Sequence, residues 1–221
     1  RAKYNIFISG GSASGKTTFL NALSNYIPKD ERVITIEDSA ELQIKGVANL
    51  VRLETRNANV EGKGEVTIRD LIRSSLRMRP ERIIVGEVRG AEALDMLQAM
   101  NTGHDGSLST GHSNSTKDML SRLETMVISG NSIPIEAIRQ QIASALDIII
   151  QLSRLRDKSR RTLEITEVVG YENGAIRLNP LYRFVEHGET EDGRIIGGLE
   201  RTENPLVHTY KFHMAGLSDQ V

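Results

Sequence analysis

The first residues that could do chemistry form a glycine-rich stretch near the amino terminus, GGSASGKT at residues 10–17. The stretch fits the pattern G-x-x-x-x-G-K-[ST], in which glycines let the backbone curl so that successive N–H groups point at phosphate oxygens. Lys16 is expected to reach the β- and γ-phosphates of a nucleotide, and the Thr17 hydroxyl to bind Mg²⁺. The predicted nucleotide-binding residues are Gly10, Gly11, Ser12, Ala13, Ser14, Gly15, Lys16, Thr17 and Thr18.

A second candidate is an acid that follows a short apolar run, Ile83-Ile84-Val85-Gly86-Glu87. Such a run is typical of a buried parallel strand, and it would deliver Glu87 to the magnesium and water region. Glu87 is therefore the predicted general base or water-positioning residue. Many motifs of this kind carry Asp where Gly86 stands, so magnesium is expected to depend on Thr17, phosphate and water. The alternative is that Glu87 is simply an exposed acid.

Two further candidates also follow predicted strands. Glu37 follows the run Val33–Ile36 and could hold a magnesium-bound water or assist Glu87. Asp38 and Glu41 could equally be charges at a helix amino terminus. His112 follows the strand candidate 107–110 and could bond a γ-phosphate oxygen, although a lone histidine is more often structural.

Basic residues crowd the middle of the chain. An ATPase needs at least one arginine to stabilise the charge on the transferring phosphoryl group, and a neighbouring subunit sometimes supplies it. Arg52 and Arg56 are the first choice for this role because they flank a strand end. The run 154–161 is also basic. A solvated turn is the favoured interpretation of that run, and contact with phosphate or lipid head groups is the alternative.

The elements that must position these residues alternate between strand and helix through about residue 152. That alternation predicts a mostly parallel sheet covered by helices on both faces, with ligands at the carboxyl ends of its strands. Leu163–Tyr171 and Ala175–Leu181 are joined by Asn173-Gly174, which predicts a C-terminal antiparallel hairpin. The polar chain from His187 onward is expected to be a tail or a small hairpin.

Composition excludes several classes of protein. The 221 residues include 28 Lys and Arg and 29 Asp and Glu, a net charge of −1 that offers no global field for nucleic acid or an anionic membrane. No cysteine is present, which removes disulfides and thiolate chemistry, and no apolar run approaches the roughly 20 residues that cross a bilayer. Because the sequence starts at Arg1 without Met, we expect an excised domain.

Four stretches in this order resemble the Walker A, Asp box, Walker B and His box of the secretion ATPases, which power type II and type IV secretion and type IV pili. They lie at residues 10–17, 36–42, 78–90 and 110–114. The connecting sequence is most similar to the CpaF-type ATPases of Flp/Tad pilus systems. The resemblance covers about residues 4–184, and one departure is Ser113, where the His box usually has Ala.

The resemblance implies a RecA-like C-terminal motor domain at 1–184, a tail or hairpin at 185–221, and a missing N-terminal domain. It also implies a hexamer that uses ATP and Mg²⁺, with Glu37, Glu87 and His112 serving hydrolysis. The expected function is to power Flp/Tad pilus assembly or protein export from the cytoplasmic face of the inner membrane. Membrane contact would come only through platform proteins, and no nucleic acid is expected as a partner.

Two alternatives to this function remain open. One is a RecA-like nucleic-acid motor, which would need a basic channel. The other is an interaction module that binds ATP but is inactive without its N-terminal domain.

Overall fold

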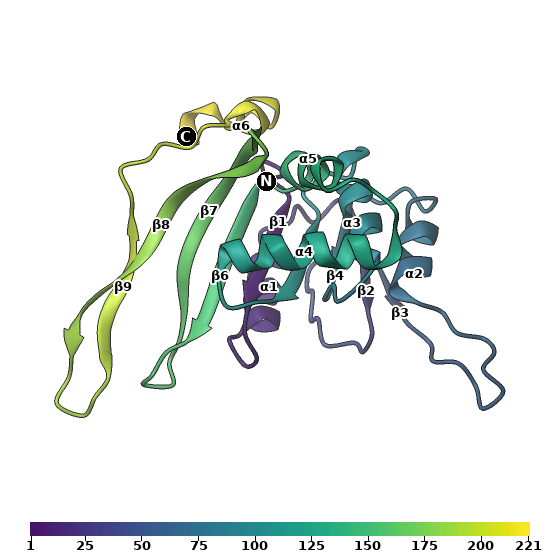
Figure 1. Cartoon of the computed structure of the whole chain (residues 1–221), viewed down its shortest axis with the longest axis horizontal. Helices are drawn as coiled ribbons and strands as arrows, with labels where there is room; N and C mark the ends of the chain where they lie inside the picture. Colours follow the sequence, from purple (N-terminus) through teal and green to yellow (C-terminus); the bar gives the residue numbers. More distant parts are fainter.

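A computed structural model describes all 221 residues, and its centre is one nine-stranded sheet in the order β3-β2-β4-β5-β1-β6-β7-β8-β9 (Figure 1). The strands are β1 Ile6–Gly10, β2 Arg32–Glu37, β3 Asn49–Glu54, β4 Arg82–Val85, β5 Leu108–His112, β6 Ile148–Arg154, β7 Arg160–Glu172, β8 Ala175–Glu189 and β9 Ile195–Arg201. The helices are α1 Lys16–Ser24, α2 Ile68–Ser75, α3 Glu92–Asn101, α4 Thr116–Gly130, α5 Ile135–Ala145, α6 Tyr210–Met214 and the 3-10 helix η1 Ser218–Gln220.

The first six strands in the sheet order, from β3 across to β6, are parallel, as the alternation of elements predicts. Successive strand residues point to opposite sides of the sheet, so these apolar strands present buried side chains on both faces, and helices cover each face. Ile34 and Ile36 pack in the core with α2 to α5, whereas Val33 packs with Leu20 of α1 on the other side. The fold therefore confirms a mixed α/β sheet with two buried faces, and all the parallel strands end at one common edge.

The sheet continues through three antiparallel strands, β7, β8 and β9. The β7–β8 turn is the predicted one: Asn173 and Gly174 both have positive φ, 52° and 79°, as a two-residue hairpin turn requires. The predicted domain boundary at residue 184 falls within β8, and β9 extends the sheet by one more strand.

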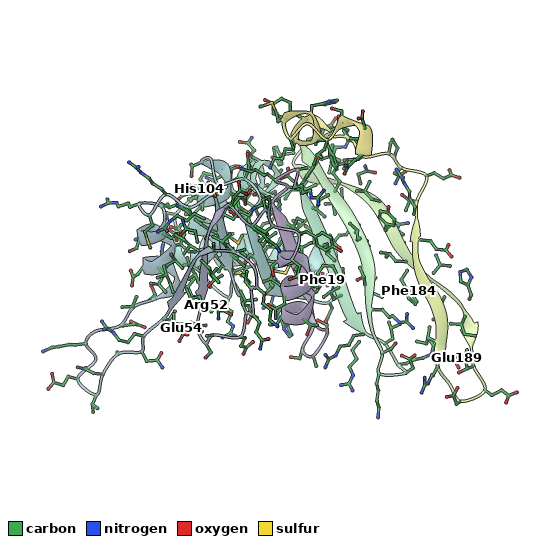
Figure 2. All side chains as sticks on the ribbon, turned by 180° about the vertical axis from the view of Figure 1, so that it is seen from behind. Phe19, Arg52, Glu54, His104, Phe184 and Glu189 are labelled. Carbon is green, nitrogen blue, oxygen red and sulfur yellow. The ribbon has the colours of Figure 1, made fainter.

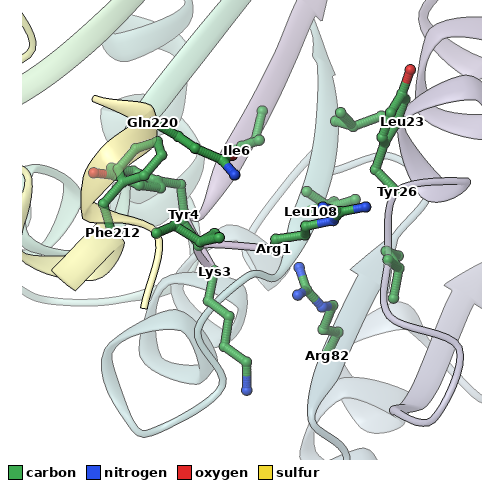
Figure 3. A pocket seen from close by; sticks show the side chains of 13 residues that line it. Arg1, Lys3, Tyr4, Ile6, Leu23, Tyr26, Arg82, Leu108, Phe212 and Gln220 are labelled. Atoms are coloured by element: carbon green, nitrogen blue, oxygen red, sulfur yellow. The ribbon is translucent and has the colours of Figure 1, made fainter. Parts of the chain in front are cut away.

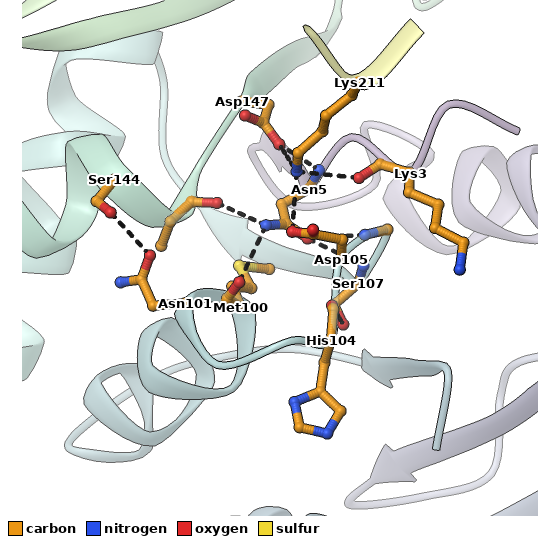
Figure 4. Close-up of polar contacts among 12 residues, drawn as sticks. Lys3, Asn5, Met100, Asn101, His104, Asp105, Ser107, Ser144, Asp147 and Lys211 are labelled. Carbon is orange, nitrogen blue, oxygen red and sulfur yellow. Dashed lines mark hydrogen bonds and ion pairs between the residues drawn. The ribbon is translucent and has the colours of Figure 1, made fainter. Parts of the chain in front are cut away.

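The C-terminal segment turns back over the amino ends of the strands (Figure 1). Lys211 of α6 donates to Asp147 Oδ2 at 2.6 Å and to Asp105 Oδ1 at 3.0 Å, and Asp147 also accepts from the Asn5 backbone (Figure 4). Tyr4 packs on Phe212 with ring centroids 5.4 Å apart. Burial, assisted by Asp147 and Glu167, raises the pKa of Tyr4 to about 12. The residues after β9 are therefore tied to the start of the chain.

A mostly apolar cavity of about 250 Å³ lies between this segment and α1 (Figure 3). Its walls include Ile6, Arg82 and Leu108, which open β1, β4 and β5. It therefore lies at the amino ends of the strands, opposite the edge where the motif residues lie. No helix of the chain is long and apolar enough to span a bilayer.

Candidate functional site

The glycine-rich loop connects β1 to α1 at the carboxyl edge of the sheet, and we call residues 10–17 the P-loop. Its curl needs left-handed backbone at Ala13 and Gly15, whose φ values are 57° and 94°. A Cβ at Gly10 would collide with Ser14 Oγ, so only glycine fits there. The first turn of α1 has no side-chain cap, which leaves its N–H groups for an anion.

Lys16 lies across the P-loop. Its Nζ donates to the carbonyl oxygens of Gly10 and Gly11, both at 2.9 Å. Burial lowers the pKa of the Lys16 ammonium, and the nearby negative charge of Glu87 opposes that shift. A partly desolvated cation beside free N–H groups is a strong attractor for a polyphosphate.

Glu37 ends β2 as a buried side chain with 6% exposure. Its Oε1 accepts from the backbone N–H groups of Glu41 and Leu42, at 3.1 and 2.9 Å, which ties down the loop after β2. No helix follows β2, so the interpretation of Asp38 and Glu41 as helix-terminal charges is wrong.

Gly86 leaves the room that Glu37 occupies. A Cβ added to Gly86 would lie 2.9 Å from Glu37 Cγ, closer than side-chain carbons approach one another. This contact explains why glycine stands where many such motifs have Asp: the carboxylate comes from β2 instead.

Glu87 follows β4 and is held by an arginine that the sequence analysis did not select. Arg89 donates to Glu87 Oε2 through Nε at 3.0 Å and through Nη2 at 2.7 Å, and it lies 3.6 Å from Asp38. The carboxylate of Glu87 raises the pKa of the Arg89 guanidinium. The sequence does carry a signal for this pair: Arg89 stands two residues after Glu87, a spacing that allows a local ion pair.

Thr17, Glu37 and Glu87 line one polar cavity of about 220 Å³ together with Lys16. Hydroxyl and carboxylate oxygens are the donors that Mg²⁺ takes, and it usually keeps waters and substrate phosphates as further ligands. No three His, Cys, Asp or Glu side chains come together as a metal cage. The donor set therefore fits Mg²⁺ held through Thr17 and the phosphates of a bound nucleotide.

His112 ends β5 directly beside Gly10 of β1. It lines a second cavity, of about 420 Å³, with Ser12 to Thr18, Glu87 and Arg160. Four strand ends thus bring together the P-loop, Glu37, Glu87 and His112, as the sequence analysis expects.

Arg52 and Arg56 do not join this group. Arg52 is exposed on β3, the edge strand, next to the loop 55–65 that projects from the body (Figure 2). Arg56 donates to Gly64 O at 2.6 Å within that loop. Neither side chain lines the two cavities around the P-loop. Arg56 instead lines a neighbouring cavity with Asp38 and Arg89. Action of Arg52 or Arg56 on phosphate, within this subunit or on a neighbouring one, stays a prediction.

The family model described as type II/IV secretion system protein matches residues 1–188. The chain belongs to this family. A putative conjugal transfer protein of Mycobacterium tuberculosis is 39% identical over 201 residues, 91% of this chain and 56% of that protein. The conjugal transfer protein TrbB of Rhizobium radiobacter is 39% identical over 175 residues, 78% of this chain and 50% of that protein. The chain therefore spans about half the length of these relatives.

Solved structures agree with this assignment to the type II/IV secretion system proteins. The VirB11 ATPase of the Brucella suis type IV secretion system, in complex with sulphate, superposes with a TM-score of 0.67 at 35% identity, over 74% of this chain and 48% of that one. The pilus retraction motor PilT with bound ADP has a TM-score of 0.55 at 22% identity, over 99% of this chain and 52% of that one. At this identity the likeness supports the fold alone. The predicted secretion ATPase superfamily and RecA-like α/β fold are confirmed.

Proposed function

We propose that this secretion system protein hydrolyses ATP to ADP and phosphate at the P-loop edge of its sheet. The observation that carries the proposal is the convergence of Lys16 and Thr17 with Glu37, Glu87 and His112 from four strand ends. A site with only the nucleotide-binding residues of the P-loop could bind ATP without hydrolysing it. A buried carboxylate and an acid at the strand end next to the P-loop add what hydrolysis needs.

In this proposal each side chain has one task. Lys16 and the N–H groups of α1 bind the phosphates. The Thr17 hydroxyl would hold Mg²⁺, which when bound would supply positive charge beside the phosphates. Glu87 orients the attacking water and accepts its proton, which requires Arg89 to release part of its hold on the carboxylate. His112 donates to a γ-phosphate oxygen, and Glu37 positions a water beside Glu87.

We further propose that the full protein is a hexameric motor of a Flp/Tad-type pilus or of a type II or type IV export system. It would work at the cytoplasmic face of the inner membrane through platform proteins. An N-terminal domain would close on the P-loop edge, and Arg52 or Arg56 would act on the nucleotide of a neighbouring subunit. Residues 1–184 would form the motor core, and residues 185–221 would extend it.

This role predicts a specific phenotype. Deleting the gene is expected to abolish surface pili or the export of a set of proteins, and a plasmid copy of the wild type is expected to restore them, whereas Glu87→Gln is not. Electron microscopy of cells and analysis of secreted proteins provide the readout. Unchanged pili and secretion in the deletion strain would contradict the role. Turnover stimulated by DNA or RNA would favour the nucleic-acid motor, for which a net charge of −1 offers little support.

Gly86→Ala tests the contact between β4 and Glu37. The added methyl would displace the Glu37 side chain, and a displacement near 1 Å is enough to cost about tenfold or more in turnover. The affinity for ATP, measured by calorimetry, should stay within about twofold because no P-loop atom moves. Gly170→Ala in β7 is the matched control, since an added Cβ there meets no atom within 4 Å. Equal turnover of the two variants would contradict the role of Glu37.

A further inference from the structure

The turn between β6 and β7 stands beside the P-loop. Leu152 of β6 pairs with Gly10 at the end of β1, and β6 then runs on to Arg154 before the chain reverses into β7 at Arg160. The turn therefore extends past the carboxyl edge of the parallel sheet, on the same side as the P-loop (Figure 1).

The turn is held in place by its own hydrogen bonds. Asp157 accepts from the Ser159 N–H at 2.9 Å, from the Ser159 hydroxyl at 2.6 Å and from the Ile195 N–H at 2.9 Å. These bonds lower the pKa of Asp157 to about 2, so the carboxylate stays charged and the turn stays tied to β9 at neutral pH.

The basic side chains of this turn have different partners. Arg156 pairs with Glu186 and Glu189, and Arg161 lies over the Phe184 ring, 5.9 Å from its centroid. The Arg160 side chain is exposed and makes no ion pair or hydrogen bond, and its Cδ lies 3.4 Å from where a Cβ on Gly15 would be. Neighbouring strand residues point to opposite faces, so Arg161 turns to Phe184 while Arg160 turns to the P-loop. An unpaired guanidinium at an anion-binding loop is a ready phosphate ligand.

We propose that Arg160 binds the phosphate chain of the nucleotide at its α- and β-phosphates. The sheet order favours these two phosphates over the γ-phosphate. Glu87 follows β4 and His112 ends β5, both on one side of β1, whereas Arg160 comes from β7 on the other side. Arg160 thus enters the cavity that it shares with Glu87 and His112 from the opposite side of β1, away from the groups assigned to the γ-phosphate. This inference rests on the proposed function, and it means that a turn interpreted from sequence as solvated takes part in nucleotide binding.

Calorimetric titration of the full-length protein with Mg²⁺-ATP and with Mg²⁺-ADP tests the inference. Arg160→Ala should weaken both nucleotides by the same factor, about tenfold or more, as for one lost charge-assisted hydrogen bond. Arg160→Lys should keep part of the affinity because it keeps the charge but not the bidentate fork. The control is Arg183→Ala on β8, which changes the net charge equally and is also exposed.

The outcomes separate this inference from the proposed function. Unchanged affinity of Arg160→Ala, or the same loss in Arg183→Ala, would overturn the role of Arg160 while leaving the P-loop site intact. A loss for ATP but not for ADP would overturn the assignment to the α- and β-phosphates. A wild-type protein that binds neither nucleotide would overturn the proposed function itself.

Discussion

Lys16→Ala is expected to remove nucleotide binding, with affinity for ATP and ADP falling by about 100-fold or more. The substitution deletes the one ammonium that lies inside the P-loop. The carbonyl oxygens of Gly10 and Gly11 keep their bonds from Ser113 and Ser14, so the loop itself should hold its shape. A charge-assisted contact to two phosphates, lost in a partly desolvated site, is worth about 3 kcal/mol, which corresponds to more than 100-fold. Titration with a fluorescent ADP analogue measures the loss.

The control for Lys16→Ala is Lys117→Ala. Lys117 also lies in the first turn of a helix, α4, but it is exposed and lies outside both P-loop cavities. We expect Lys117→Ala to bind nucleotide as the wild type does and both variants to unfold at similar temperatures. Retained binding by a folded Lys16→Ala protein would contradict the assignment of the P-loop as the nucleotide site.

Glu87→Gln is expected to separate binding from hydrolysis. The amide has the same shape and can still accept a hydrogen bond from Arg89, but it cannot take a proton from the attacking water. Loss of a general base costs about 10²- to 10⁴-fold in turnover. Affinity for ATP should remain within a few-fold, because Lys16 and the N–H groups of α1 are unchanged. Phosphate release and calorimetry on one preparation give both values.

The matched control for Glu87→Gln is Glu124→Gln. Glu124 on α4 is also paired with an arginine, Arg139, at 2.9 Å, but it lines neither cavity around the P-loop. We expect normal turnover from this variant. Comparable losses from both substitutions would show that breaking any such ion pair slows the enzyme, and Glu87 would lose its special role.

Local pattern was enough to predict the carboxyl edge of the parallel sheet. The run Ile83–Val85 is apolar because β4 is buried on both faces, and Asn173-Gly174 specifies its turn through positive φ. The P-loop is a contiguous motif whose geometry depends on its own glycines. These features are encoded within a few residues of one another, so the sequence alone predicts them.

Contacts between residues that lie far apart in the sequence could not be predicted from local pattern. Arg160 meets Gly15 only because β6 lies next to β1, and Lys211 meets Asp147 only because the C-terminal segment returns to the start of the chain. The bond from Arg89 to Glu87 was hidden for a similar reason, since the side chain that reaches Glu87 depends on how the chain turns after β4. Polar composition after His187 left a tail or a small hairpin open, and the hairpin is what forms, because β9 pairs with β8 and buries Ile195.

The proposed mechanism places ATP hydrolysis where Glu87 meets the P-loop. The decisive measurement is Mg²⁺-dependent phosphate release from the full-length protein after its oligomers have been separated by size. It compares the wild type with a Glu87→Gln variant that has been shown to bind ATP. We predict release by the wild type that rises with oligomer size and a loss of about 100-fold or more in Glu87→Gln oligomers of the same size. Equal release by both proteins, or no release by a wild-type oligomer that binds ATP, would contradict ATP hydrolysis at Glu87.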